Sequence, residues 1–214
     1  MQRFKKIVKH NKKKLIAALI ICLAYYFCLP KVLFTAPTST VITSKNNLLL
    51  GAKIADDGQW RFPENKVIPD KFKACILAFE DEYFYKHPGF NPISIIKAFK
   101  ENYNSGQIKR GGSTITQQVI RLSRQGKQRT YWEKFKEIIL ATRLELRYNK
   151  EDILALYSSH APFGGNVVGI DAASWRYFNR NAKDLSWSES ATLAVLPNAP
   201  SLIYPGKNQQ SLLA

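Results

Sequence analysis

The feature that most constrains this chain is an uncharged apolar run near its amino terminus. Residues 15–29, LIAALIICLAYYFCL, follow a segment that holds seven Lys and Arg residues and no Asp or Glu. The apolar residues 32–34 prolong the run, which gives the roughly 20 residues that a helix needs to cross a bilayer. Because dense positive charge stays on the cytoplasmic side, this flank orients such a helix. We therefore predict a cytoplasmic segment 1–14, a single-pass transmembrane anchor 15–34 and an extracytoplasmic remainder.

A cleaved signal peptide is the alternative to an anchor. No small-x-small cleavage site follows the run, and neither Cys22 nor Cys28 is preceded by a small residue. These two cysteines lie in the predicted anchor, and the third, Cys75, stands alone among apolar residues. The chain thus shows no disulfide framework and no CxxC metal pattern. We expect Cys75 to pack in the core, and we expect no metal site made by protein residues.

Charge narrows the class of partner. The chain has 32 Lys and Arg against 16 Asp and Glu; without the seven basic residues before the apolar run, 25 remain against 16. Such an excess favours a polyanion: nucleic acid, phospholipid headgroups or a phosphorylated substrate. Because the densest basic segment adjoins the predicted anchor, we favour membrane lipids and a phosphorylated substrate, and we expect no nucleic acid.

The rest of the chain divides into a connector and a helical domain. Residues 35–68 are rich in turn-forming residues, and we predict a membrane-proximal connector with a hairpin over 47–62 that turns at Asp57-Gly58. Helical spacing of apolar residues then predicts a mainly α domain over 69–206. Helices are expected from Pro69 to a stop at His87-Pro88-Gly89, from Pro92 to Ser105, from Ser113 as N-cap, over 126–148, from Asn149, over 170–178 and from Ser186 to Leu196.

Three of these helices have apolar faces that we expect to be buried. The residues concerned are Phe72, Cys75, Ile76 and Phe79 in the first helix, Ile93, Ile96 and Phe99 in the second, and Ile115, Val119 and Leu122 in the third.

The stretch AFEDEYFYKHPG, residues 78–89, is the first candidate for chemistry. Three consecutive carboxylates, residues 80–82, stand between Phe79 and three aromatic residues. Since helical neighbours point about 100° apart, one carboxylate should face the apolar side. Desolvation there raises its pKa toward the range of a general base, and we select Glu80 for this role. The alternative is a solvated acidic face followed by an ordinary turn.

The stretch KRGGSTITQQVIRLSR, residues 109–124, is the second candidate. A Gly-Gly turn leads into a helix whose polar stripe consists of Thr114, Gln117, Gln118 and Arg121. A helix N-terminus after a glycine turn, with basic residues nearby, is suited to bind phosphate oxygens. The P-loop spacing is absent, so nucleotide binding is not implied. The alternative is a plain loop followed by an amphipathic helix.

Glu137 is the third candidate. Glu133, on the same expected helix, is explained by a capping box with Thr130. Glu137 has no such explanation, because it directly precedes the apolar residues 138–141. The alternative is an i, i+3 ion pair with Lys134 on a solvated face.

Together these stretches resemble the motifs of one known family. The matching blocks are EDEYFYKHPG (80–89), RGGSTITQQ (110–118), KFKEIILATRLE (134–145) with LALYSSHAPFGGNVVGIDAASWRYF (154–178), and SESATLAVLPNAPSLIYP (188–205). Their order resembles that of peptidoglycan glycosyltransferases of family 51, the membrane-anchored domains of class A penicillin-binding proteins and their monofunctional relatives. The resemblance covers residues 40–206 and is strongest to the penicillin-binding protein 1C type.

The resemblance implies a lysozyme-like fold with two lobes, the smaller against the bacterial plasma membrane. It implies that lipid II, a disaccharide-pentapeptide on undecaprenyl pyrophosphate, is polymerised into glycan strands. Glu80 matches the general base that deprotonates the 4-hydroxyl of the acceptor sugar, and Glu137 matches a glutamate near the donor pyrophosphate. The other matched positions are Arg121, Arg129 and Lys134 as cations for the pyrophosphate, Ser113, Thr114, Gln117 and Gln118 in the donor cleft, and Asp81, Phe84, His87 and Gly89 in the first motif.

The resemblance also implies partners and leaves alternatives open. Lipid II, the growing strand, membrane lipids and cell-wall synthesis proteins are the expected partners; no cofactor is required, although magnesium could assist at the pyrophosphate. Residues 207–214 would begin a linker to a carboxyl-terminal transpeptidase region. The chain departs from the family at Ser158-Ser159, where leucine-asparagine is usual, and at Arg121, where many members have lysine. A glycan-cleaving hydrolase or lytic transglycosylase, and an inactive cell-wall scaffold, are the competing functions.

Overall fold

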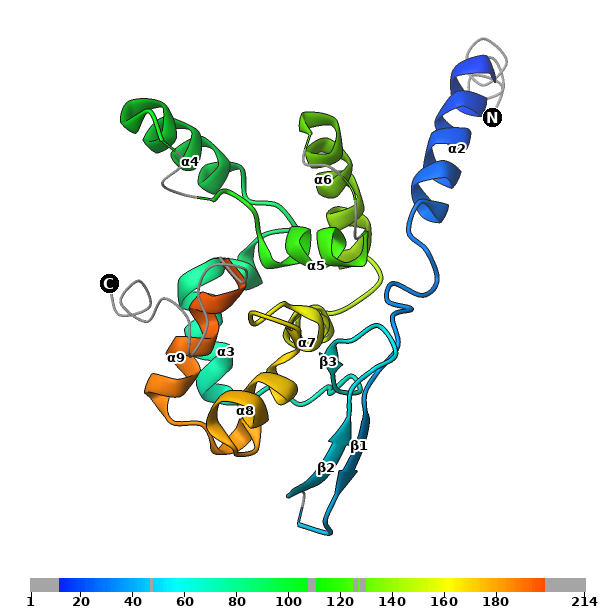
Figure 1. Cartoon of the computed structure of the whole chain (residues 1–214). Helices are drawn as coiled ribbons and strands as arrows, with labels where there is room; N and C mark the ends of the chain where they lie inside the picture. Colours follow the sequence, from blue (N-terminus) through cyan, green and yellow to red (C-terminus); the bar gives the residue numbers. More distant parts are fainter. Residues whose placement is uncertain (1–11, 47, 108–110, 125–126, 128–129, 199–214) are drawn as a thin grey trace. The chain divides into compact units, whose positions relative to one another are not determined.

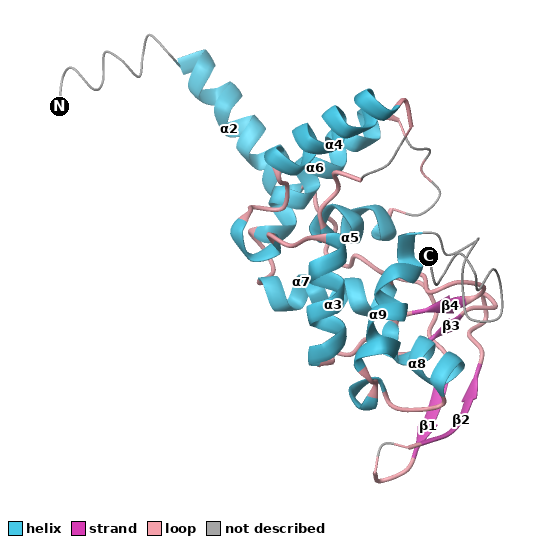
Figure 2. Cartoon of the chain, turned by 90° about the vertical axis from the view of Figure 1, so that its left-hand side faces the viewer, coloured by secondary structure: helices cyan, strands magenta, loops and turns pink. Residues whose placement is uncertain are grey.

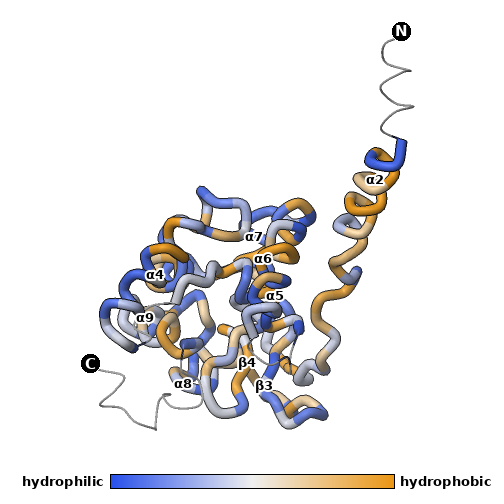
Figure 3. Tube along the Cα trace, turned by 90° about the horizontal axis from the view of Figure 1, so that it is seen from above, coloured by the Kyte–Doolittle hydropathy of each residue, from blue (hydrophilic) through white to orange (hydrophobic). Residues whose placement is uncertain are grey.

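The computed structural model describes residues 12–46, 48–107, 111–124, 127 and 130–198 (Figure 1). The chain divides into two compact units, Met1–Leu33 and Phe34–Ala214. The first contains helix α2, Lys12–Phe27, which begins with three lysines and continues with apolar residues (Figure 3). The helix therefore covers only part of the predicted anchor 15–34. Among the described residues no helix is both long and apolar enough to cross a membrane, so the anchor remains a prediction from the sequence.

The second unit is mainly helical, which confirms the predicted class (Figure 2). Its α-helices are α3 (Asp70–Glu80), α4 (Pro92–Ser105), α5 (Ile115–Ser123), α6 (Tyr131–Glu145), α7 (Lys150–His160), α8 (Ile170–Phe178) and α9 (Trp187–Val195). Short 3-10 turns cover Phe84–Lys86, Ala182–Asp184 and Leu196–Asn198. Among these helices α5 packs against both α6 and α7, while α3 packs against α9.

Helix α5 is buried on nearly every side. Ile115, Val119 and Ile120 are fully buried, and so is the polar residue Gln117. Helix α5 packs against α6 and α7 along its length, and this packing fixes its orientation. The side chains of α5 are therefore held rigidly. The expected polar stripe is accordingly divided, because Gln117 is buried whereas Gln118 is only partly so.

The start of α5 corrects the predicted cap. Thr114, not Ser113, is the N-cap: its Oγ1 accepts a hydrogen bond from Gln117 N, and Gln117 Oε1 accepts one from Thr114 N. This reciprocal capping box satisfies two amides that the helix cannot pair internally. Ser113 therefore stays outside the helix, where its hydroxyl accepts a hydrogen bond from Lys134.

The hairpin was predicted at the wrong residues. The strands are β1 (Thr40–Thr43), β2 (Leu49–Lys53), β3 (Trp60–Arg61) and β4 (Val167–Val168). Strands β1 and β2 form the antiparallel hairpin, and β3 pairs in parallel with β4. Asp57-Gly58 instead turns the chain from β2 toward β3. Arg61 Nη1 holds this turn, at 2.8 Å from Asp57 Oδ2 and 2.6 Å from Pro37 O.

Helix α3 ends earlier than predicted. Its last residue is Glu80, and Asp81, with φ −160° and ψ 71°, has left the helical conformation. Phe72 and Ile76 are fully buried, as expected. Phe79, however, is 49% exposed, so its predicted burial is wrong, and Cys75 is only half-buried.

Helix α4 has the predicted bounds but not the predicted burial. It starts at Pro92 after an Asn91 cap and ends before Gly106, whose φ is 63°. Ile93 and Ile96 are 64% and 67% exposed, so their expected burial is wrong; the Phe99 side chain lies outside the described part of the chain. Figure 1 shows α4 and α6 extending from the part of this unit where α5 lies.

Gly169 allows a direct test of how α8 starts. We expect Gly169→Ala to lower the free energy of unfolding by about 2–5 kcal/mol, because a positive φ costs about 1–2 and overpacking about 1–3 kcal/mol. Its φ is 86°, and an added Cβ would lie 2.6 Å from Ser159 O. Urea unfolding followed by circular dichroism measures the loss. Gly58→Ala is the matched control, because Gly58 has φ 75° with nothing within 4 Å of its Cβ position. Equal losses in both variants would contradict the steric explanation.

Candidate active site

A cavity of about 410 Å³ opens at the carboxyl end of α3. Its lining consists of residues 78–83, Ser94, residues 111–114, Gln118, Arg121, Pro197 and Asn198. The first two candidate stretches and the end of the last helix therefore meet at one place, although they are far apart in sequence. The volume is that of a small-ligand site.

Glu80 lies in the wall of this cavity as the last residue of α3. Its Oε2 accepts a 2.7 Å hydrogen bond from Gln118 Nε2, while its buried Oε1 has no hydrogen-bond partner among the described residues. Burial raises the pKa of Glu80, against the Gln118 hydrogen bond and the Arg121 charge, which both lower it. Gln118 thus holds the carboxylate at the cavity wall, and a carboxylate with a raised pKa is suited to act as a general base.

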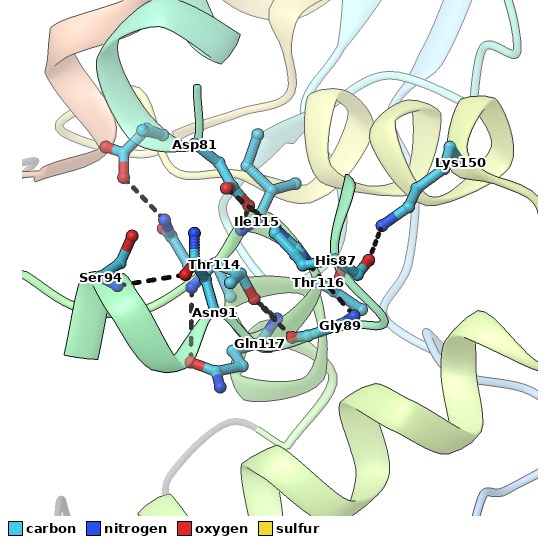
Figure 4. A network of polar contacts seen from close by, with 12 residues as sticks. Asp81, His87, Gly89, Asn91, Ser94, Thr114, Ile115, Thr116, Gln117 and Lys150 are labelled. Carbon is cyan, nitrogen blue, oxygen red and sulfur yellow. Dashed lines mark hydrogen bonds and ion pairs between the residues drawn. The ribbon is translucent and has the colours of Figure 1, made fainter. Parts of the chain in front are cut away.

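Asp81 is the most buried of the three consecutive carboxylates, and its partners are structural (Figure 4). Both of its oxygens lie 3.0 Å from His87 Nε2, and Oδ2 accepts a 3.0 Å hydrogen bond from Ile115 N. His87 Nδ1 accepts from Gly89 N, so the proton of the neutral ring is on Nε2. Asp81 therefore joins the end of α3 to the positive end of α5.

Positive charge comes from Arg121 on α5, which lines the cavity, and from Lys134 on α6, which contacts the cavity residue Ser113. Arg121 Nε is 3.8 Å from Glu137 Oε1, and Lys134 Nζ is 3.8 Å from Glu137 Oε2. Lys134 Nζ also donates to Ser113 Oγ and, at 3.0 Å, to Gln117 Oε1. Glu137 does form the i, i+3 ion pair with Lys134, but it is only 9% exposed, so the pair does not lie on a solvated face. Glu137 does not line the cavity; it contacts Arg121, which does, and Lys134, which donates to Ser113.

The predicted site residues fall into three groups. Glu80, Asp81, Ser113, Thr114, Gln118 and Arg121 line the cavity; Gln117 and Glu137 do not line it, and both contact Lys134; Arg129 lies outside the described residues. The structure therefore brings the first two candidate stretches into one cavity and connects the third to it through Arg121 and Lys134.

Some residues near the cavity carry no clear signal in the sequence. Phe79 and Tyr83 add partly exposed aromatic rings to its lining, and Asn198 adds an amide. On α7, the fully buried Tyr157 has no hydrogen-bond partner for Oη among the described residues; burial and the nearby Glu80 charge raise its pKa. Asn198 ends the 3-10 turn that follows α9, and nothing local in the sequence marks Tyr157, whose burial depends on tertiary contacts.

Asp81→Asn is expected to lower the free energy of unfolding by about 2–4 kcal/mol. The asparagine NH₂ group must face either the Nε2–H of His87 or the N–H of Ile115, and both of these are donors. Urea unfolding monitored by circular dichroism checks this loss. Asp56→Asn is the matched control, because Asp56 is exposed. If both variants unfold at the same urea concentration as the wild type, Asp81 does not connect α3 to α5.

The fold and the cavity together define a mainly helical domain built around one partly buried glutamate that faces a cationic wall. A family model described as "Transglycosylase" matches residues 50–214, and the chain belongs to this family. It is similar to penicillin-binding protein 1C of Escherichia coli (strain K12), with 41% identity over 152 residues, 71% of this chain and 20% of that protein. It is also similar to penicillin-binding protein 1F of Bacillus subtilis (strain 168), with 40% identity over 147 residues, 67% of this chain and 21% of that protein. The chain thus spans about a fifth of the length of these relatives.

Proposed function

We propose that this chain is a peptidoglycan glycosyltransferase that polymerises lipid II into glycan strands and releases undecaprenyl pyrophosphate. One observation carries the proposal: Glu80 lines the same cavity as the Gly-Gly-Ser turn and Arg121. A base and a cation on opposite sides of a reacting sugar are what transfer from a pyrophosphate donor requires.

In the proposed reaction, the Glu80 carboxylate takes the proton of the acceptor 4-hydroxyl as the hydroxyl oxygen attacks the anomeric carbon of the donor. The bond from that carbon to the pyrophosphate breaks, and the electron pair leaves with the pyrophosphate. Arg121 faces this developing charge, and Lys134 positions Ser113 beside it. Gln118 keeps Glu80 oriented through its hydrogen bond to Oε2.

The proposed steps include no required cofactor. Among the described residues no group of three His, Cys, Asp or Glu side chains could hold a metal ion. In this proposal a magnesium ion that assisted at the pyrophosphate would be bound mainly by the oxygens of the substrate.

We also propose that the chain acts at the plasma membrane, through the anchor 15–34, with its cytoplasmic segment at 1–14. Apolar side chains on α4 and α6 support a membrane-facing smaller lobe of a lysozyme-like fold. Ile93, Ile96, Trp132 and Phe135 are 64%, 67%, 62% and 51% exposed. Lys97 and Lys100 on α4 are exposed as well and are suited to anionic headgroups. In a longer protein like the relatives, residues 207–214 would begin the linker to a transpeptidase region.

Incubation of the full chain in detergent with lipid II, and separately with finished peptidoglycan, tests the function. We expect strands to grow from lipid II and the finished polymer to stay intact. Cleavage of the polymer without growth would indicate a hydrolase or lytic transglycosylase, and no reaction with either would indicate a cell-wall scaffold. Ser158-Ser159 does not favour the scaffold, since neither residue lines the cavity.

A further inference from the structure

A second cavity, of about 490 Å³, lies at the opposite end of α3. Its walls come from β1, the segment 62–69, α8 and residues 181–183. Pro69, which caps the start of α3, lines this cavity, whereas Glu80 at the end of α3 lines the first. The length of α3 therefore separates the two cavities by about 15 Å.

The lining of this second cavity combines aromatic and polar groups. Phe62 and Trp175 are half-buried rings, and Val67 adds an apolar side chain. Asn65 and Asp171 place an amide and a carboxylate among them. Such a surface can contact a flat ligand face through the rings while its polar groups bind the ligand edge.

Asp171 is the principal hydrogen-bonding group of this cavity. Its Oδ2 accepts a 3.2 Å hydrogen bond from Asn65 Nδ2. A carboxylate can accept about four hydrogen bonds, so it has capacity for donors from a ligand. Burial raises the pKa of Asp171, although the hydrogen bond from Asn65 lowers it.

The polar groups are held in place from behind. Asn65 N donates to Ser159 Oγ at 3.3 Å, and Asn65 Oδ1 accepts from Val67 N at 2.9 Å. The neighbouring Glu64 Oε1 lies 2.7 Å from His160 Nε2. The ring of His160 in turn stacks on that of Phe34. Ser159 thus supports this cavity through Asn65. Side chains fixed in this way lose little entropy when a ligand binds.

We propose that this cavity binds a sugar unit of the glycan strand, and this rests on the function proposed above. A pyranose ring has a face of C–H groups that packs on Trp175, and hydroxyl and amide donors at its edge that reach Asp171 and Asn65. Phosphate is disfavoured because, among the described residues of the lining, the two carboxylates Glu64 and Asp171 outnumber the one basic residue, Lys183. A strand held at a second point remains bound between additions, so the products become longer.

Binding is tested on the full chain in detergent, with Glu80→Gln introduced so that no catalysis occurs. The probe is a peptide-free tetrasaccharide fragment of glycan strands, and the readout is the ¹⁵N-indole NMR signal of each tryptophan. We expect the Trp175 signal to shift, and Asp171→Asn to weaken that binding by about tenfold. Trp187→Ala is the matched control, because Trp187 is 61% exposed and lines neither cavity; we expect it to leave binding unchanged.

Strand length provides a second, independent measurement. With active Glu80, Asp171→Asn is expected to shorten the strands made from lipid II, while Trp187→Ala leaves their length unchanged. A Trp175 signal that does not move with the tetrasaccharide, or that moves only with free stem pentapeptide, overturns the proposal even if the chain polymerises lipid II. A Trp175 shift that Asp171→Asn weakens supports the sugar site even if polymerisation is never observed, in which case only the proposed reaction fails.

Discussion

Glu80→Gln is expected to slow glycan-strand growth by about 10²- to 10⁴-fold, the range that one general base contributes. Glutamine keeps the size of the side chain and can still accept the hydrogen bond from Gln118, but it cannot take a proton from the acceptor sugar. Growth is measured as polymer made from labelled lipid II by the full chain in detergent. Lipid II binding, measured separately, is expected to stay near the wild-type value, because the change leaves the cationic wall intact.

The same variant is expected to unfold at an equal or higher temperature. Burial raises the pKa of Glu80, so the charged form is disfavoured in the folded protein. The free energy of unfolding of the wild type therefore falls as pH rises from the pKa of Glu80 in the unfolded chain through its higher pKa in the folded protein. Glutamine does not ionise, so the Glu80→Gln variant does not lose this stability at neutral pH. Glu151→Gln is the control: the Glu151 side chain is 56% exposed and pairs with Lys73, so we expect little change in activity. Wild-type growth by Glu80→Gln would reject Glu80 as the base.

Local signals were enough to predict several helix ends. Asn149 and Ser186 cap α7 and α9 as expected, because a side-chain cap is formed by residues three positions apart. Gly106 ends α4 for an equally local reason, a positive φ. The end of α3 could not be predicted in this way. Asp81 leaves the helix to bond Ile115 N, which is 34 residues away.

Hydrophobic periodicity predicted faces but not what covers them. The spacing of Ile93 and Ile96 gives α4 an apolar side, yet both remain exposed in this unit. Conversely, the polar side chain of Gln117 predicts a surface position, but Gln117 is buried because α5 packs against both α6 and α7. Burial depends on which elements meet, and a single sequence does not contain that information directly.

The candidate site was predicted better than its surroundings. The carboxylate run and the Gly-Gly-Ser turn are unusual in sequence, and the structure places both in one cavity. Glu137 does not line the cavity but contacts Arg121 and Lys134, and its place near the pyrophosphate stays a prediction. The second cavity could not be predicted from the sequence, because Asn65 and Asp171 are 106 residues apart.

Arg121→Gln is expected to lower kcat/KM for lipid II by about 10²- to 10³-fold, the loss typical of removing one group that stabilises transition-state charge. Arg121 lines the cavity with Glu80 and is the basic residue among the described residues of that lining. The measurement is initial polymerisation rate against lipid II concentration. Since the Arg121 charge lowers the pKa of Glu80, its removal should also move the acid limb of the rate profile to higher pH.

These two effects together separate charge stabilisation from a structural role. Arg176→Gln is the matched control, because Arg176 is exposed on α8 and lines neither cavity; we expect its rate and its acid limb to match those of the wild type. A general loss of folding in Arg121→Gln would lower the rate at every pH without moving the limb. A third outcome would be an acid limb at higher pH together with the wild-type kcat/KM for lipid II. A cation that stabilises the leaving pyrophosphate must change the rate of its departure. This outcome would therefore place Arg121 beside Glu80 but not at the pyrophosphate.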